Sequence, residues 1–238
     1  FTFFFFLSLL TYISYAEAKG AKAPYYIASI FFFALSIMSK PMAVTLPLIL
    51  IIIDLCPLER TIGLRRSITE KIPFFILSGL SGLLTIWAQS AGGAISTLEA
   101  YPFQIRLLVA LRGYAFYLYK LILPTGLVPL YPYPENVRVS SIEYLGSIAL
   151  ISIITAVSIA TFRRYRFFSA AWAFYLITLL PVIGLMQVGS QPAADRYMYL
   201  PSFAPFILLG ILAGYLASRQ SVKNKKGAYL VGAVTVLL

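Results

Sequence analysis

Long apolar runs, closed by Pro, Gly or basic clusters, constrain this chain more than any other feature. Each run is about 15 to 21 residues long, which is the length that a helix needs to cross a hydrocarbon layer of roughly 30 Å. Only 11% of the 238 residues are charged and 60% are hydrophobic, whereas soluble domains carry roughly 25% charged residues. The sequence therefore predicts an all-α fold, a polytopic transmembrane helical bundle.

The predicted spans make up a single truncated transmembrane domain over residues 1–238. Both ends of the sequence fall inside apolar runs, so we interpret the chain as a fragment that is incomplete at both ends. The spans are predicted at residues 1–16, 25–38, 42–56, 73–89, 142–162, 167–186, 203–217 and 228–238.

The positive charges gather in four short connectors, at residues 17–23, 57–71, 163–166 and 218–227. By the positive-inside rule these connectors are cytoplasmic. Residues 25–56 then join two cytoplasmic connectors and must cross the membrane twice. Because Pro41 lacks an N–H and disfavours helical geometry at the residue before it, we expect a hinge there, with Lys40 at the outer face.

Residues 105–123 form an apolar segment that carries Arg106, Arg112 and Lys120 among tyrosines. A full crossing here would place all later connectors on the wrong sides of the membrane. The segment also carries more charge than a lipid-facing span tolerates. We therefore predict an interfacial or re-entrant helix at the outer face. The alternative is a buried span with a second crossing between Leu127 and Tyr133.

The outer connector after residue 186 contains Asp195 and Arg196, an unusual density of polar groups in so apolar a chain. Arg donates planar hydrogen bonds to phosphate oxygens, Asp orients the Arg or accepts from sugar hydroxyls, and Tyr rings stack on sugar faces. The alternative is a local ion pair within an interfacial aromatic belt. The flanking residues with the same potential are Gln187, Gln191, Tyr197 and Tyr199.

Three further charged residues, Lys40, Arg106 and Asp54, are interpreted one at a time. Lys40 is either a counter-ion for a lipid phosphate or a side chain that snorkels to the interface. Arg106 is expected to contact an anionic headgroup. Asp54, close to the cytoplasmic end of its span, is interpreted as a capping or interfacial group.

The sequence contains no His and a single cysteine, Cys56. The commonest general base and metal ligand is therefore missing, which argues against zinc chemistry and a Ser-His-Asp mechanism. Cys56 is interpreted as a packing residue, and the sequence predicts no metal site and no nucleic-acid partner.

Six motifs resemble, in order and spacing, the membrane half of a bacterial family whose soluble half consists of tetratricopeptide repeats. That half is in turn similar to the eukaryotic transmembrane and tetratricopeptide-repeat protein O-mannosyltransferases. The motifs are Ser39–Pro47, Asp54–Arg60, Glu70–Phe74, Tyr131–Pro134, Gln187–Gly189 and Ala194–Pro201.

The resemblance implies a GT-C-like glycosyltransferase of the bacterial inner (plasma) membrane. Such an enzyme transfers a sugar, here implied to be mannose, from a polyprenyl-phosphate donor to a protein or glycan at the outer face. Lys40, Arg106 and the polar residues around Asp195 would line the donor site. The catalytic acidic residue is implied to lie upstream of Phe1, so the fragment alone is expected to be inactive. Two alternatives stay open: a transporter or flippase for lipid or polyprenyl phosphate, and a non-catalytic membrane anchor for the repeats.

Overall fold

The computed structural model describes residues 1–60, 63–91, 102–134, 137, 139, 141–185 and 193–220. Within these residues the secondary structure is helical apart from one isolated bridge, between Tyr131 and Ala193, so the predicted all-α class is confirmed. The elements are α1 (Thr2–Glu17), α2 (Ala23–Ser39), η1 (Pro41–Thr45), α3 (Leu46–Leu55), α4 (Leu64–Thr69), α5 (Ile72–Ala91), α6 (Phe103–Ile122), α7 (Ile142–Ala160), α8 (Arg166–Leu179), η2 (Leu180–Val182), η3 (Asp195–Met198) and α9 (Phe203–Gln220).

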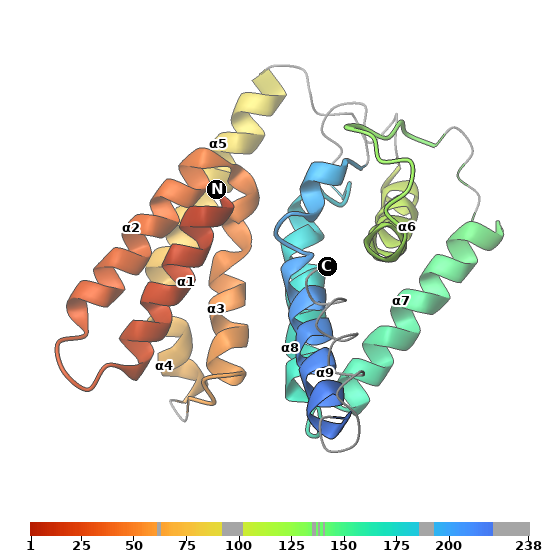
Figure 1. The fold of residues 1–238 in the computed structure, drawn as a ribbon. Coiled ribbons are helices and arrows are strands. Elements are labelled where there is room, and N and C mark those ends of the chain that lie inside the picture. Colours follow the sequence, from red (N-terminus) through yellow and green to blue (C-terminus); the bar gives the residue numbers. More distant parts are fainter. Residues whose placement is uncertain are drawn as a thin grey trace.

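Most of the long helices run up and down between two opposite ends of the molecule (Figure 1). The connectors α1–α2, α3–α5 and α7–α8, which are the basic ones, lie at the lower end in this view. An ion pair between Glu59 and Arg166, with an N–O distance of 2.7 Å, joins two of these connectors. The hinge between α2 and η1 and the η3 turn lie at the upper end. Three of the four basic connectors therefore share one end, as the positive-inside assignment requires, and residues 221–227 of the fourth lie outside the described residues.

The helix breaks follow the prolines. Lys40 has an extended backbone, with φ −161° and ψ 125°, directly before Pro41, and the chain resumes as a short 3-10 turn before α3. The predicted span 42–56 is thus a 3-10 turn followed by a ten-residue helix. In the same way, the predicted span 167–186 ends its α-helix at Leu179, and a 3-10 turn containing Pro181 follows.

The segment predicted at 105–123 is α6, one continuous helix over Phe103–Ile122. Figure 1 shows α6 nearly end-on, whereas α8 and α9 are seen from the side and run up and down in the picture, so the axis of α6 is strongly inclined to theirs. Residues 123–134, the place proposed for a second crossing, contain no helix. The inclined axis is what an interfacial or re-entrant helix requires, and the depth of α6 in a membrane stays a prediction.

Two apolar cores hold the helices together, and α8 contributes to both. The first core packs α1, α2, α3 and α5 against Phe174 of α8, and the second packs α6 and α7 against Trp172 and Tyr175. Small polar residues bring α1 and α2 close. The Ser8 hydroxyl donates to the Ser29 carbonyl at 2.8 Å, and the Ser29 hydroxyl donates to the Ser8 carbonyl at 2.9 Å. Such exchanged serine bonds are typical of closely packed helices in membranes.

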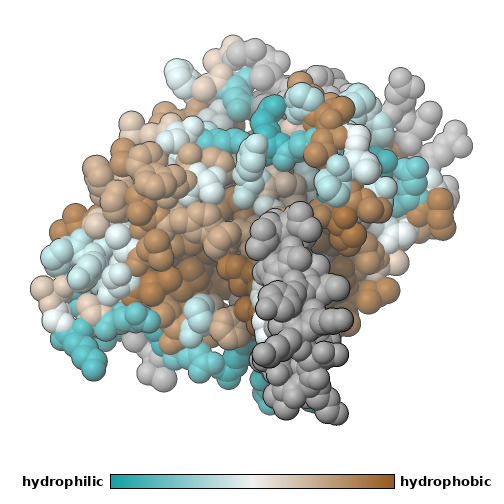
Figure 2. Space-filling view, in the orientation of Figure 1, coloured by the Kyte–Doolittle hydropathy of each residue, from teal (hydrophilic) through white to brown (hydrophobic). Residues whose placement is uncertain are grey.

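Two helices among the described residues, α5 and α7, are long and apolar enough to cross a membrane. Five further apolar helices are shorter: Thr2–Glu17, Ala23–Ser39, Pro41–Leu55, Arg166–Val182 and Phe203–Tyr215. Figure 2 shows hydrophobic residues across the middle of the face in view, with hydrophilic residues toward its upper and lower margins. The number of crossings stays a prediction, and the predicted span 228–238 lies outside the described residues.

Candidate functional site

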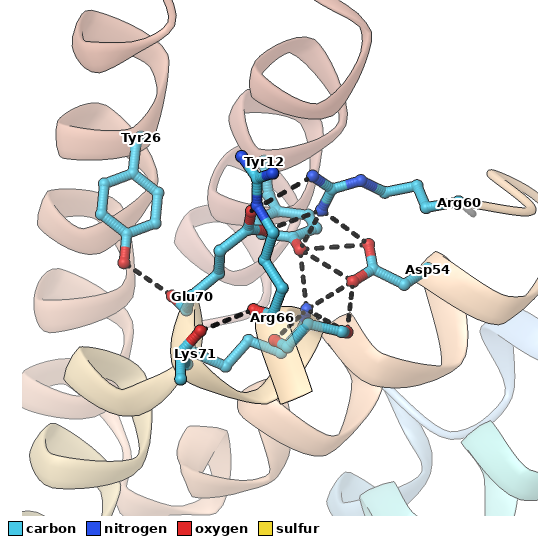
Figure 3. A network of polar contacts seen from close by, with 9 residues as sticks. Tyr12, Tyr26, Asp54, Arg60, Arg66, Glu70 and Lys71 are labelled. Atoms are coloured by element: carbon cyan, nitrogen blue, oxygen red, sulfur yellow. Dashed lines mark hydrogen bonds and ion pairs between the residues drawn. The ribbon is translucent and has the colours of Figure 1, made fainter. Parts of the chain in front are cut away.

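A buried network of polar side chains occupies the lower end, and Asp54 is its centre (Figure 3). The Asp54 carboxylate accepts hydrogen bonds from the Tyr12 hydroxyl at 3.0 Å and from the Ser67 hydroxyl at 2.8 Å. It also forms ion pairs with Lys71 and Arg60. Three helices, α1, α3 and α4, and two connector residues, Arg60 and Lys71, therefore meet at one carboxylate.

Each cation of this network faces a carboxylate. Arg60 contacts Glu70 at 2.9 Å and Asp54 at 3.2 Å, and Lys71 is completely buried. Lys71 and Arg60 also donate to the Tyr12 hydroxyl, at 2.8 and 2.9 Å. A buried ion pair offsets its desolvation cost when both charges are compensated and well bonded, and this network meets that condition. Its arrangement is that of a structural clamp between helices.

The interpretation of Asp54 as a capping or interfacial group was wrong. The residue is 3% exposed and its partners come from positions up to 42 residues away along the chain. Spacing along one helix could not predict this, since the contacts depend on how α1, α3 and α4 pack. The signal that was available is the number of acids and bases between positions 54 and 71. Ionisable residues in apolar segments usually pair with one another.

A second polar cluster, the outer cation pair, lies at the upper end and consists of Lys40 and Arg196. Both cations lie over the ring of Tyr197, with Lys40 Nζ at 5.3 Å and the Arg196 guanidinium carbon at 5.4 Å from its centre. Lys40 also lies 5.3 Å from the Phe1 ring centre. Two segments that are about 156 residues apart in sequence thus place two positive charges on one aromatic platform.

The outer cation pair has no acidic partner among the residues that the structure describes. Burial, and then the positive charge of Arg196, lower the pKa of Lys40. Two adjacent cations repel each other unless an anion lies between or beside them. Their arrangement is therefore suited to bind an anion such as a phosphate, to which Arg and Lys both donate.

Asp195 does not pair with its neighbour Arg196. Its carboxylate accepts a hydrogen bond from the Tyr131 hydroxyl, with distances of 3.0 and 3.3 Å to the two oxygens. Burial, and then the bond to Asp195, raise the pKa of the Tyr131 hydroxyl. The alternative of a local Asp195–Arg196 ion pair is therefore not what the structure contains, and Asp195 is bound within the protein.

The remaining predicted site residues are dispersed. Tyr199 is 74% exposed, and Arg106 is buried on α6 at 5% exposure. Gln187 and Gln191 lie outside the described residues. In the described part of the chain, no group of three His, Cys, Asp or Glu residues could hold a metal ion. The structure thus brings together Lys40, Arg196 and Tyr197 from the predicted set, with Asp195 beside them in the chain.

An apolar groove of about 520 Å³ lies between α2 and α5 and includes Pro41, the residue after Lys40. Its polar residues are Ser81, Thr85 and Gln89, which follow one another at a spacing of four along α5. The other lining residues are Ile37, Met38, Leu77, Leu80, Leu84 and Ala88. An apolar groove of this composition fits a hydrocarbon chain.

Comparisons of the sequence and structure with protein-family models, curated proteins and solved structures give no match.

Proposed function

We propose that this chain is part of a multi-pass membrane glycosyltransferase of the GT-C type, in a bacterial inner membrane. The full-length enzyme would transfer a sugar, mannose by the resemblance of its motifs, from a polyprenyl-phosphate donor to a protein or glycan at the outer face. The observation that carries this proposal is the outer cation pair of Lys40 and Arg196. These cations share one aromatic ring and have no carboxylate partner among the described residues.

The position of the pair supports an outer-face site. It lies at the end of the bundle opposite the basic connectors, which the positive-inside rule assigns to the cytoplasm. The groove between α2 and α5 adjoins the same hinge through Pro41, so a lipid tail and its phosphate would find apolar and cationic surfaces on neighbouring residues. The exposed apolar surfaces of α5 and α7 support their contact with lipid.

The chemistry proposed for the pair is stabilisation of the leaving phosphate. As the glycosidic bond to the phosphate breaks, negative charge grows on the phosphate oxygens, and fixed cations lower the energy of that state. Asp195 is bound to Tyr131, so we assign the role of base to a carboxylate elsewhere in the full-length protein. In keeping with the motif resemblance, we expect it upstream of Phe1 and expect residues 1–238 alone to be inactive.

Sugar transfer in the full-length protein tests this proposal. We expect membranes that contain it to transfer labelled sugar from a polyprenyl-phosphate donor, and Arg196→Ala and Arg196→Lys both to reduce the rate. Arg164→Ala, at an exposed arginine of the opposite end, is the matched control and should keep the wild-type rate. Wild-type rates in both Arg196 variants would contradict the assignment.

A transporter of anionic lipid is the second candidate, because the chain is interrupted at η1 and η2 and these two 3-10 turns pack against each other. Discontinuous helices that meet near a substrate are typical of transporters. Movement of a fluorescent polyprenyl phosphate across liposomes that contain the protein, with no sugar transfer, would favour this candidate over the enzyme.

A further inference from the structure

Residues 123–134 form a strap between α6 and the rest of the upper end, and polar contacts hold it in place. Its apolar side chains are largely exposed, with Leu127 at 54% and Leu130 at 48%. Lys120 donates to the carbonyls of Thr125 and Gly126, which fixes the start of the strap. Burial of apolar surface therefore contributes little to its position.

The far end of the strap is bound to the segment that carries the cations. The Tyr131 N–H donates to the Ala193 carbonyl at 3.0 Å, and its hydroxyl donates to Asp195 at 3.0 Å. Tyr117 of α6 binds the next residue, Ala194, through both backbone groups, at 2.9 and 3.1 Å. Tyr131 thus reaches the one carboxylate that lies directly beside Arg196 in the chain.

We propose that Tyr131 is a positioning residue that keeps the Asp195 carboxylate away from the outer cation pair. With Asp195 bound to the tyrosine hydroxyl, Arg196 remains over the Tyr197 ring near Lys40 and donates one long hydrogen bond, of 3.4 Å, to the Pro129 carbonyl. Neither cation is then neutralised by the Asp195 carboxylate, and both can bind an external phosphate. Without that hydroxyl, the carboxylate is free to neutralise Arg196 or Lys40 and competes with the ligand. This inference rests on the proposed phosphate site and adds a residue of the protein, Tyr131, that sets the affinity of this site for phosphate.

The geometry of Tyr131 favours this role over simple packing. The Tyr131 ring already packs edge-on against Phe116, with 4.8 Å between ring centres, and Lys120 Nζ lies 5.6 Å from the centre of the Tyr131 ring. These contacts survive in a phenylalanine. Tyr131→Phe therefore removes the bond to Asp195, together with a longer contact of 3.4 Å to the Gly126 carbonyl, and leaves the aromatic contacts. Adding Asp195→Asn then tells the two hydroxyl contacts apart, because only the first involves the carboxylate.

A double-mutant cycle with the full-length protein in lipid nanodiscs tests the proposal, with a fluorescent polyprenyl monophosphate as the probe. We expect Tyr131→Phe to weaken binding about tenfold, the size of one charge-assisted hydrogen bond or ion pair. Adding Asp195→Asn should restore the affinity to within about threefold of the wild type, because the competing charge is gone. Tyr119→Phe, at a tyrosine of α6 that is 53% exposed, is the control and should bind like the wild type.

A merely structural role for Tyr131 predicts the opposite result. In that case Asp195→Asn would leave the affinity of Tyr131→Phe unrepaired or reduce it further, and the proposal would fail. Unchanged binding in Tyr131→Phe would overturn it as well.

A second measurement separates this failure from failure of the phosphate site itself. In a Cys56→Ala background, Val128→Cys should react with a maleimide faster after Tyr131→Phe, since the strap has lost a tether. Equal rates would refute the tether. If the wild type binds no polyprenyl phosphate, the proposed function and the competition both fail, while the labelling rates still report on the tether.

Discussion

The two polar clusters of this chain lie at opposite ends and differ in whether carboxylates compensate their positive charges. At the lower end, Asp54 and Lys71 are buried, Arg60 and Glu70 are partly buried, and each cation contacts a carboxylate. At the upper end, Lys40 and Arg196 share a tyrosine ring and have no carboxylate within ion-pair distance in the described structure. Compensated charge stabilises a fold, whereas uncompensated charge is suited to a ligand. The comparison therefore assigns structure to one end and binding to the other.

The largest effect is expected from Asp54→Ala at the lower end. Removing this carboxylate leaves Lys71 buried without its ion-pair partner, and breaking a buried pair in this way costs about 3–5 kcal/mol. Thermal unfolding in detergent measures the loss. Glu59→Ala, which breaks the exposed pair with Arg166, should cost about 1 kcal/mol or less.

The combination of Asp54→Asn with Lys71→Met sharpens this prediction. It removes both charges of the pair, so it should be less destabilising than Asp54→Ala although it changes more atoms. An equal or larger loss would mean that packing, and not charge compensation, governs the lower cluster.

A smaller loss is expected from Tyr12→Phe. The hydroxyl donates to Asp54 and accepts from Arg60 and Lys71, so its removal leaves a buried network partly unsatisfied, at about 1–3 kcal/mol. Tyr25→Phe, at a tyrosine of α2 that is 45% exposed, is the matched control and should leave the unfolding temperature unchanged.

At the upper end, Lys40→Met is expected to change the free energy of unfolding by about 1 kcal/mol or less, because burial and Arg196 already disfavour the charge. A loss as large as that of Asp54→Ala would erase the contrast between the two clusters. Phosphate binding should respond instead.

The same lysine gives that binding a pH dependence. Lys40 is charged below its pKa, and burial and Arg196 hold that pKa below the usual range for lysine. As the pH rises, Lys40 should therefore lose its charge, and phosphate affinity should fall, at a lower pH than if Lys40 were fully exposed. In Arg196→Ala the repulsion is gone, so the pKa of Lys40 rises and the remaining fall moves to higher pH. A titration of lipid binding in each variant checks both directions.

The smallest effect is expected from Tyr199→Ala. The ring is 74% exposed and belongs to neither cluster. Both unfolding and polyprenyl-phosphate binding should match the wild type, within about 0.5 kcal/mol for unfolding. A clear loss of binding would extend the site beyond the residues that we assign to it.

Local patterns in the sequence predicted much of the architecture. The apolar runs predicted helices, and Pro41 predicted the break after α2, because a proline constrains its own backbone and that of the residue before it. The basic connectors predicted which helix ends lie together. These features depend on neighbours in the chain, so a sequence reveals them.

Contacts between distant segments were predicted less well. Lys40 and Arg196 were predicted to line one outer site, but their shared contact with Tyr197 was not, because it depends on how α2 meets η3. The bond between Tyr131 and Asp195 spans 64 residues, and the Asp54 network spans up to 59. Such contacts depend on how the helices pack against one another, and the spacing of residues along the chain does not predict that packing.

Equilibrium binding of a polyprenyl monophosphate to the full-length protein in nanodiscs tests the central claim most directly. The account predicts that Arg196→Ala reduces the affinity about tenfold or more and leaves thermal unfolding unchanged, while Arg164→Ala at the basic end changes neither. Equal affinities for the wild type and Arg196→Ala, or the same loss of affinity in Arg164→Ala, would contradict the assignment of ligand binding to the outer cation pair.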